Sequence, residues 1–123
     1  MRYKHFKNAD VSVSALAVGT WAIGGQNYGQ VDRSDSVRAI RTMIDQGVNL
    51  VDTAPCYGNG ASEKIVGEAL RGIPRDQILI STKFGLITDV YSGEYIKHAS
   101  YKSVMREVES SLMNLETDYI DFY

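Results

Sequence analysis

Short apolar runs alternate along the chain with segments whose apolar residues recur at helical spacing. Strands that are separated by helices pair in parallel, with right-handed crossovers. The pattern therefore predicts an α/β fold that follows a small N-terminal hairpin. The expected elements are the hairpin at 3–6 and 11–13, strands at 15–18, 48–51, 78–82 and 119–123, and a helix in each interval between these strands.

Residues that favour helix ends mark the limits of the three predicted helices. Asp32 or Ser34 is expected to cap the first helix, and Gly47 to end it in a left-handed conformation. Ser62 is expected to start the second helix, and Ser100 to cap the third. Their apolar faces are formed by Val37, Ile40, Met43 and Ile44, by Ile65, Val66, Ala69 and Leu70, and by Val104, Val108, Leu112 and Leu115.

Two longer connections carry no clear periodicity. Residues 24–29 are rich in glycine and are expected to form a loop. Residues 84–99 are expected to form a long loop that carries Tyr91 and Tyr95. The length of this second loop favours either a substrate lid or a mobile segment over close packing.

Two architectures suit this order of elements: an open doubly wound sheet, and part of a (β/α)8 barrel. A complete barrel needs about 250 residues, whereas the chain has 123. In the barrel interpretation the chain therefore forms about half of the fold.

Composition and charge exclude several function classes. The chain is 44% hydrophobic and 23% charged, with a net charge of −2 and no basic stripe that could follow a phosphate backbone, so nucleic acid is not an expected partner. Neither an apolar signal core nor a run of 18 apolar residues is present, so we expect a soluble protein that does not span a membrane. Cys56 is the only cysteine and cannot form an internal disulfide, which fits the reducing cytoplasm. We expect it to behave as a small buried apolar residue.

Polar side chains follow three predicted strands at the ends where parallel α/β folds bind ligands. Thr20 and Trp21 follow the first strand, Asp52 the second and Lys83 the third. Tyr57 lies in the loop after the second strand. Because the carboxyl ends of parallel strands meet at one edge, we expect these side chains to lie together.

Each of these residues also has a purely structural interpretation. Asp52 can cap a turn or form a structural ion pair with Lys83, and Tyr57 can be one of eight packed tyrosines. Together they suit acid–base chemistry, because a phenol has a pKa of about 10 and a nearby ammonium lowers it. Such a phenol is a competent general acid for the alkoxide that develops when hydride reaches a carbonyl carbon.

Motifs along the chain resemble, in order, those of the aldo-keto reductase family of (β/α)8-barrel, NADP-dependent oxidoreductases. The most specific block is VDTAPCYGNGASEKIVGEAL at 51–70. The segments GTWAIGG and DTAPCYGNG are most similar to bacterial members related to channel β-subunits. The matching positions are Val18-Gly19-Thr20-Trp21, Asp52-Thr53-Ala54, Tyr57-Gly58, Ser62-Glu63, Gly67, Lys83 and Thr117-Asp118-Tyr119-Ile120-Asp121, which cover essentially the whole chain.

The resemblance implies a partial (β/α)8 TIM barrel, made of an N-terminal β-hairpin plus about four parallel strands and three helices. It implies that residues 1–123 are the N-terminal half of the barrel. Residues 1–14 would be a hairpin that plugs the barrel bottom. Residues 15–123 would be the first βα units, ending in the fourth strand.

The same resemblance assigns expected roles to the candidate residues. Tyr57 would be the general acid that protonates the oxygen of an aldehyde or ketone, Lys83 would tune it, and Asp52 would pair with Lys83. Thr20, Trp21 and Asp52 would contact the nicotinamide ribose or line the substrate pocket. The implied cofactor is NADPH and the implied substrate is a small carbonyl compound.

Parts of the family's site have no counterpart in these residues. The family's catalytic histidine would fall just past Tyr123, and by position neither His5 nor His98 replaces it. Phosphate sites of such barrels commonly follow strands 7 and 8. The glycines at 58 and 60 do not complete a dinucleotide fingerprint, because Glu63 stands where the third glycine is required. We therefore expect this chain alone to be inactive and to bind NADPH weakly or not at all.

Two other functions stay open at this point. The chain could be a non-catalytic half-barrel that associates with itself, or a cofactor-sensing regulatory subunit. Unpaired strand edges and an uncovered barrel interior favour association. The expected partner is therefore a second copy of the chain or the missing C-terminal half.

Overall fold

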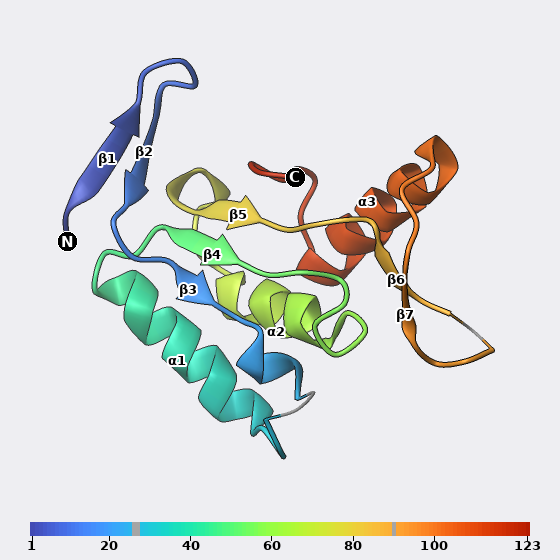
Figure 1. The fold of residues 1–123 in the computed structure, drawn as a ribbon. Helices are drawn as coiled ribbons and strands as arrows, with labels where there is room; N and C mark the ends of the chain where they lie inside the picture. The colour runs from blue at the N-terminus through green and yellow to red at the C-terminus, as the bar shows by residue number, and fades with distance from the viewer. Residues whose placement is uncertain (26–27, 90) are drawn as a thin grey trace.

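The computed structural model describes residues 1–25, 28–89 and 91–123. A parallel sheet lies at the centre of these residues, and a hairpin lies at each side of it (Figure 1). In chain order the elements are β1 (Tyr3–Phe6), β2 (Val11–Ser14), β3 (Val18–Gly19), the 3₁₀ helix η1 (Ala22–Gly24), α1 (Arg33–Asp45), β4 (Leu50–Asp52), α2 (Ala61–Leu70), the 3₁₀ helix η2 (Arg75–Gln77), β5 (Leu79–Ser81), β6 (Leu86–Thr88), β7 (Tyr95–Lys97) and α3 (Tyr101–Leu115).

The parallel sheet has the order β3-β4-β5, so its strands end at one common edge. Gly19 of β3 is opposite Asp52 of β4, and Asp52 is opposite Ser81 of β5. An isolated parallel bridge between Ser81 and Phe122 continues the sheet toward the C-terminal segment. This register places the segments after β3, β4 and β5 side by side.

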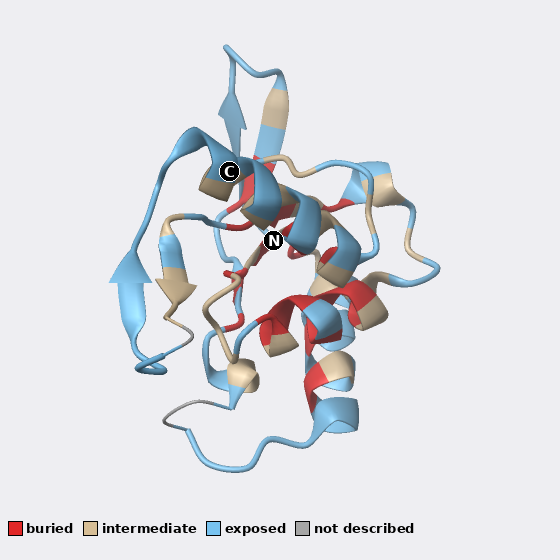
Figure 2. Cartoon of the chain, turned by 90° about the vertical axis from the view of Figure 1, so that its right-hand side faces the viewer, coloured by how far each residue is buried: buried red, intermediate tan, exposed pale blue. Residues whose placement is uncertain are grey.

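All three α-helices pack against the same face of this sheet. Val18, Val51 and Ile80 are almost completely buried and point toward the helices. Figure 2 shows buried residues along much of α2, whereas the two hairpins are mostly exposed. A doubly wound sheet would carry helices on both faces, so the arrangement favours the wall of a barrel. The core joins Val18, Ile40, Val48, Val51, Ile65, Val66, Ala69, Ile78, Ile80 and Leu115.

The predicted helix ends agree closely with the structure. The Asp32 carboxylate accepts a hydrogen bond from the Asp35 amide at 2.9 Å, and Ser100 caps α3 in the same way through its hydroxyl. Gly47 has a φ of 91°, as expected for a glycine that ends a helix. The second helix begins at Ala61 rather than at Ser62, because the Ser62 hydroxyl points into the sheet instead of capping the helix.

Three predicted elements differ from the structure. The first barrel strand was expected at 15–18 but is the short β3, because β2 extends through Ser14 and residues 15–17 are exposed. The fourth strand, expected at 119–123, is represented by the Ser81–Phe122 bridge. The expectation of an irregular loop at 84–99 was wrong, since β6 and β7 pair there as an antiparallel hairpin. Residue 90 of this loop and residues 26 and 27 of the glycine-rich loop lie outside the described residues.

The N-terminal hairpin is docked at the beginning of β4. The Asn49 side chain accepts a hydrogen bond from the Ser14 amide and donates one to the Ser12 carbonyl, each at 2.8 Å. The Tyr3 hydroxyl donates to the Gly47 carbonyl at 2.7 Å. The hairpin therefore lies at the amino end of the sheet, and its role as a barrel plug stays a prediction. Among the described residues, no helix combines the length and apolar character needed to cross a membrane.

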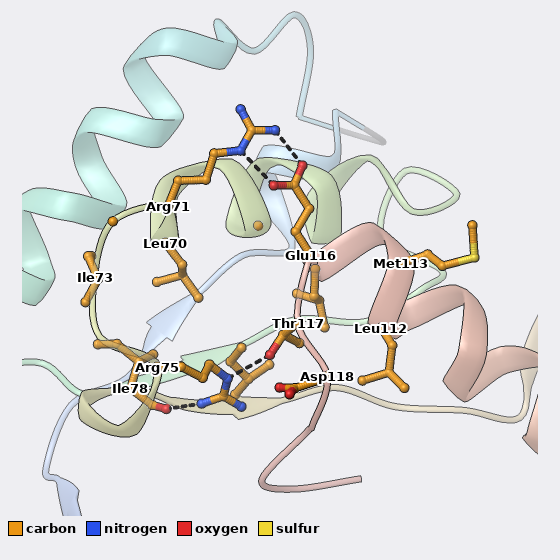
Figure 3. A pocket seen from close by; sticks show the side chains of 14 residues that line it. Leu70, Arg71, Ile73, Arg75, Ile78, Leu112, Met113, Glu116, Thr117 and Asp118 are labelled. Atoms are coloured by element: carbon orange, nitrogen blue, oxygen red, sulfur yellow. Dashed lines mark hydrogen bonds and ion pairs between the residues drawn. The ribbon is translucent and has the colours of Figure 1, made fainter.

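A groove of about 640 Å³ lies between α2, α3 and the beginning of β5 (Figure 3). Its cations are already paired: Arg71 binds the Glu116 carboxylate, and Arg75 binds Asp121 and the Thr117 hydroxyl. The groove is at the amino end of β5, away from the edge where the strands end. Its position and paired charges do not indicate a catalytic site.

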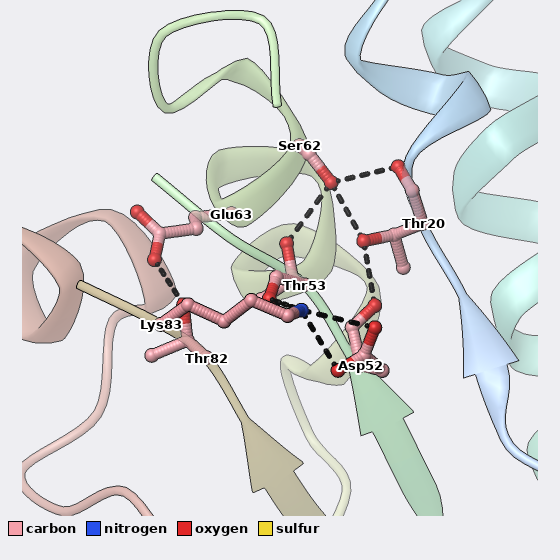
Figure 4. A network of polar contacts seen from close by, with 7 residues as sticks. All are labelled: Thr20, Asp52, Thr53, Ser62, Glu63, Thr82 and Lys83. Carbon is pink, nitrogen blue, oxygen red and sulfur yellow. Dashed lines mark hydrogen bonds and ion pairs between the residues drawn. The ribbon is translucent and has the colours of Figure 1, made fainter. Parts of the chain in front are cut away.

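A buried carboxylate joins the sheet to α2 and α3. Glu63 lies in the first turn of α2 and is completely buried, where the helix dipole favours negative charge. It accepts hydrogen bonds from the Thr82 hydroxyl at 2.8 Å and the Asn114 amide at 3.0 Å. Figure 4 shows the bond to Thr82 next to Lys83. Glu63 thereby connects the end of β5 to both helices.

Thr82→Val should destabilise the protein, because the valine keeps the shape but leaves one Glu63 oxygen without its donor. An unsatisfied buried acceptor costs about 1–3 kcal/mol. The measurement is the free energy of unfolding in urea. Thr42→Val on the exposed part of α1 is the matched control, and we expect it to change this free energy by less than about 0.5 kcal/mol. Equal effects of the two substitutions would contradict the role of the Glu63 bonds.

Candidate active site

The ends of β4 and β5 bring an ammonium onto a carboxylate. Lys83 Nζ lies 2.9 Å from Asp52 Oδ1 and 3.1 Å from Oδ2 (Figure 4). It also donates to the Thr53 carbonyl at 2.7 Å. The contact follows from the register, in which Ser81 is opposite Asp52. Lys83 comes two residues after Ser81 and therefore projects to the same side of the sheet.

The surroundings of Lys83 favour its charged form. Partial burial lowers the pKa of Lys83, but the Asp52 and Tyr57 side chains together outweigh this effect, with Asp52 the larger contributor. The Tyr57 side chain acts in the same direction as Asp52. The net result is a pKa above the ordinary value for lysine. The site therefore holds a permanent positive charge at neutral pH.

The structure places Tyr57 beside this charge. Lys83 Nζ lies 5.0 Å from the centroid of the Tyr57 ring. The Tyr57 amide donates to the Ala54 carbonyl at 3.1 Å, which holds the loop after β4 in a turn. The three residues predicted to be catalytic, Asp52, Tyr57 and Lys83, thus lie together at the carboxyl edge of the sheet, and their chemical roles stay predictions.

The two predicted cofactor contacts after β3 differ in accessibility. Trp21 is 53% exposed, and its ring stacks on Tyr57, with 6.2 Å between ring centroids and 27° between ring planes. Thr20 is buried, and its hydroxyl donates to the Asp52 carbonyl at 2.9 Å. Trp21 therefore offers a surface to a ligand. The contact expected of Thr20 with a cofactor stays a prediction.

Buried hydroxyl groups beneath the site were not predicted as a network from the sequence. Ser62 Oγ lies 2.8 Å from the Thr20 hydroxyl and 3.0 Å from the Thr53 hydroxyl. It also donates to the Thr20 carbonyl at 3.0 Å. These contacts tie the loop after β3 to the loop after β4 and to the start of α2. Their only sequence signal is the position of Ser62 within the family-like motif.

A close approach of two glycines joins the same loops. A Cβ added at Gly58 would lie 2.1 Å from the Gly24 carbonyl oxygen, and one at Gly24 would lie 2.7 Å from the Tyr57 carbonyl carbon. Gly58 also has a φ of 65°, which favours glycine. The two backbones can be in contact only because neither residue has a side chain. This contact brings the Trp21 and Tyr57 loops together.

Other reactive residue types lie outside this arrangement. His5 contacts Ser12 and Asp10 in the N-terminal hairpin, and His98 is exposed in the segment between β7 and α3. Partial burial raises the pKa of the half-buried Cys56 thiol, which disfavours the reactive thiolate. Within residues 1–25, 28–89 and 91–123, no cluster of three metal-ligating side chains is present.

Comparison with known sequences identifies relatives of the whole chain. The sequence model described as "Aldo/keto reductase family" matches residues 15–123. The chain is 43% identical over 124 residues to the aldo-keto reductase YhdN of Bacillus subtilis (strain 168), a match covering 100% of this chain and 37% of that protein. It is 40% identical over 124 residues to the NADH-specific methylglyoxal reductase of Escherichia coli (strain K12), covering 93% of this chain and 38% of that protein.

Solved structures share the same arrangement of strands and helices. The aldo-keto reductase AKR11C1 from Bacillus halodurans, in its holo form, matches with a TM-score of 0.85 at 29% identity, covering 98% of this chain and 38% of that one. An aldo-keto reductase from Klebsiella pneumoniae in complex with NADPH matches with a TM-score of 0.74 at 34% identity, with the same coverage of 98% and 38%.

These matches confirm the prediction of a partial (β/α)8 barrel. The chain spans about 37% of the length of its B. subtilis relative, so the activity of a whole barrel does not transfer to it directly. The family's sequence model matches residues 15–123, and the structural match covers 98% of the chain. The chain therefore belongs to the aldo/keto reductase family, whose members are oxidoreductases.

Proposed function

We propose that residues 1–123 supply the acid–base residues of an NAD(P)H-dependent carbonyl reductase, with Tyr57 as the general acid. The observation that carries this proposal is the position of the Lys83 ammonium, which is held by Asp52 at 2.9 Å and lies 5.0 Å from the Tyr57 ring centroid. A cation beside a phenol favours the phenolate. It therefore makes the phenol a better proton donor.

The residues of this chain control the proton in the proposed reaction. A bound nicotinamide would supply hydride to the carbonyl carbon. As negative charge develops on the carbonyl oxygen, the Tyr57 hydroxyl donates its proton and the product is an alcohol. The Lys83 ammonium stabilises the phenolate that remains, and Asp52 keeps this ammonium in place.

The site also suits the nicotinamide side of the cofactor. Trp21 presents a half-exposed aromatic face beside Tyr57, and the Asp52 side chain is 39% exposed at the same edge. We propose NADPH as the cofactor and a small aldehyde or ketone as the substrate, in a cytoplasmic enzyme. The NADPH complex of the K. pneumoniae relative supports this choice of cofactor, whereas the name of the E. coli relative specifies NADH.

The proposal can be tested in a completed barrel, in which residues 1–123 are joined to the part of the B. subtilis relative beyond its match to this chain. We expect this barrel to oxidise NADPH with a generic aldehyde and to show quenching of Trp21, the single tryptophan of residues 1–123. Tyr57→Phe should lower kcat by roughly 10²–10⁴-fold, because it removes the general acid. It should leave the cofactor quench intact.

Tyr101→Phe is the matched control, because Tyr101 is 83% exposed on α3. The 123-residue chain alone should show neither saturable quenching by micromolar NADPH nor turnover. A completed barrel in which Tyr57→Phe keeps full activity would contradict the proposed acid. Cofactor binding without turnover in the unsubstituted barrel would instead support a cofactor-sensing role.

The sheet face opposite the helices favours a second function, that of a half-barrel that associates with another copy or with a C-terminal half. Leu50 and Leu79 are opposite each other in the register and only half-buried. Both alternate with core residues that point toward the helices, so they face away from the core. Burial of an apolar face of this kind under another sheet or chain is favourable, because it removes apolar surface from water.

Light scattering at high concentration should give the 123-residue chain a mass above that of one copy, 13.6 kDa. Leu79→Glu should reduce this mass, because it places a charge on the uncovered face. Met113→Glu is the control, because Met113 is 80% exposed on α3. A compact monomer at every concentration would contradict self-association.

A further inference from the structure

The β6–β7 hairpin holds the loop that carries Tyr57 at two points. Thr88 and Tyr95 are opposite each other in the hairpin. The Tyr95 hydroxyl donates to the Cys56 carbonyl at 2.7 Å, and the Thr88 hydroxyl donates to the Asn59 side chain at 2.7 Å. The two contacts lie on either side of Tyr57 in the chain.

The peptide bond that precedes Tyr57 is fixed at both ends. Its carbonyl oxygen, from Cys56, accepts from the Tyr95 hydroxyl. Its amide, from Tyr57, donates to the Ala54 carbonyl at 3.1 Å. Because a peptide unit is planar, these two bonds together set the direction in which the Tyr57 Cα and side chain leave the loop.

The loop after β4 has a left-handed backbone at three successive residues, of which only Asn59 is not a glycine. Gly58, Asn59 and Gly60 have successive φ values of 65°, 51° and 86°. A non-glycine residue in this region is uncommon, and such conformations persist where the surrounding structure determines them. The Gly24 backbone supports the loop from one direction. The hairpin supports it from another.

The hairpin itself is anchored to α3. The Glu107 carboxylate accepts from the Gly85 amide at 2.8 Å and from the Ser103 hydroxyl at 2.9 Å. At the other end of the hairpin, the Asp89 carboxylate accepts from the Ser92 amide at 2.8 Å and closes the turn. These contacts favour a fixed support over the substrate lid that the sequence left open.

We propose that the β6–β7 hairpin acts as a brace, meaning that its hydrogen bonds fix the Tyr57 loop. Tyr95 is the positioning residue that keeps Tyr57 beside Lys83. This inference rests on the proposed role of Tyr57 as the general acid. The Tyr95 hydroxyl acts on the loop through the Cys56 carbonyl and takes no part in the proton transfer. Its removal therefore releases the carbonyl end of the peptide unit before Tyr57 and leaves the Lys83–Asp52 pair in place.

Tyr95→Phe tests this brace in the 123-residue chain by hydrogen exchange. Amides in residues 56–61 should exchange faster, because local opening of the loop becomes easier, while the amides of α1 and the central sheet keep their rates. The emission of Trp21 should also change, because its ring stacks on Tyr57. Tyr91→Phe is the matched control in the same hairpin, because Tyr91 is 96% exposed. Unchanged exchange at 56–61, or faster exchange throughout the chain, would overturn the proposal.

Kinetics of the completed barrel separate positioning from a general structural role. Tyr95→Phe should lower kcat about tenfold, because misplacing an acid group weakens proton transfer, while the KM for the cofactor stays the same. An active barrel with unchanged kcat would overturn the positioning role even if exchange increased. If the unsubstituted barrel has no activity, the proposed function fails, and the local exchange and Trp21 emission still decide whether the brace exists.

Discussion

The parallel register of β4 and β5 is the constraint on which the candidate site depends. It places Asp52 opposite Ser81, so that Lys83 reaches the Asp52 carboxylate from the next outward position. The pair is 39–46% exposed, and exposed ion pairs contribute little to stability. Backbone hydrogen bonds of the sheet therefore place the two residues side by side, and the Asp52 carboxylate and the Thr53 carbonyl then hold the ammonium. The charge remains available to act on the neighbouring phenol.

A second requirement is that the loops after β3 and β4 are joined to each other. Buried hydroxyl groups are costly unless they are hydrogen-bonded, and those of Thr20, Thr53 and Ser62 satisfy one another. The Gly24–Gly58 contact adds direct packing of the two backbones. The stack of Trp21 on Tyr57 is the visible result. A ligand that binds the indole face is thus held at a defined distance from the phenol.

Local patterns in the sequence predict the periodic and capped parts of the molecule. Helical spacing, the caps at Asp32 and Ser100 and the polar strand ends at Asp52 and Lys83 were sufficient to predict the helices and the edge where the site lies. The β6–β7 hairpin was missed because its strands are short and the turn signal at Asp89 was not recognised. The bond between Tyr95 and the Cys56 carbonyl joins residues far apart in the chain. No local pattern encodes such a contact.

The effect of Lys83 on the candidate acid depends on what packs against the sheet face opposite the helices, the face that carries Leu50 and Leu79. Phe84 and Tyr123 lie at the same edge, with ring centroids 5.0 Å apart. Burial and the charges of Glu107 and Glu63 already raise the pKa of Tyr123 to about 12. Further strands packed on this face would exclude water from Lys83 and Tyr57. The same ammonium would then act on the phenol through a lower dielectric, where its effect is larger. The register fixes the positions of the ammonium and the phenol, and the strands packed on this face determine how strongly the two groups interact.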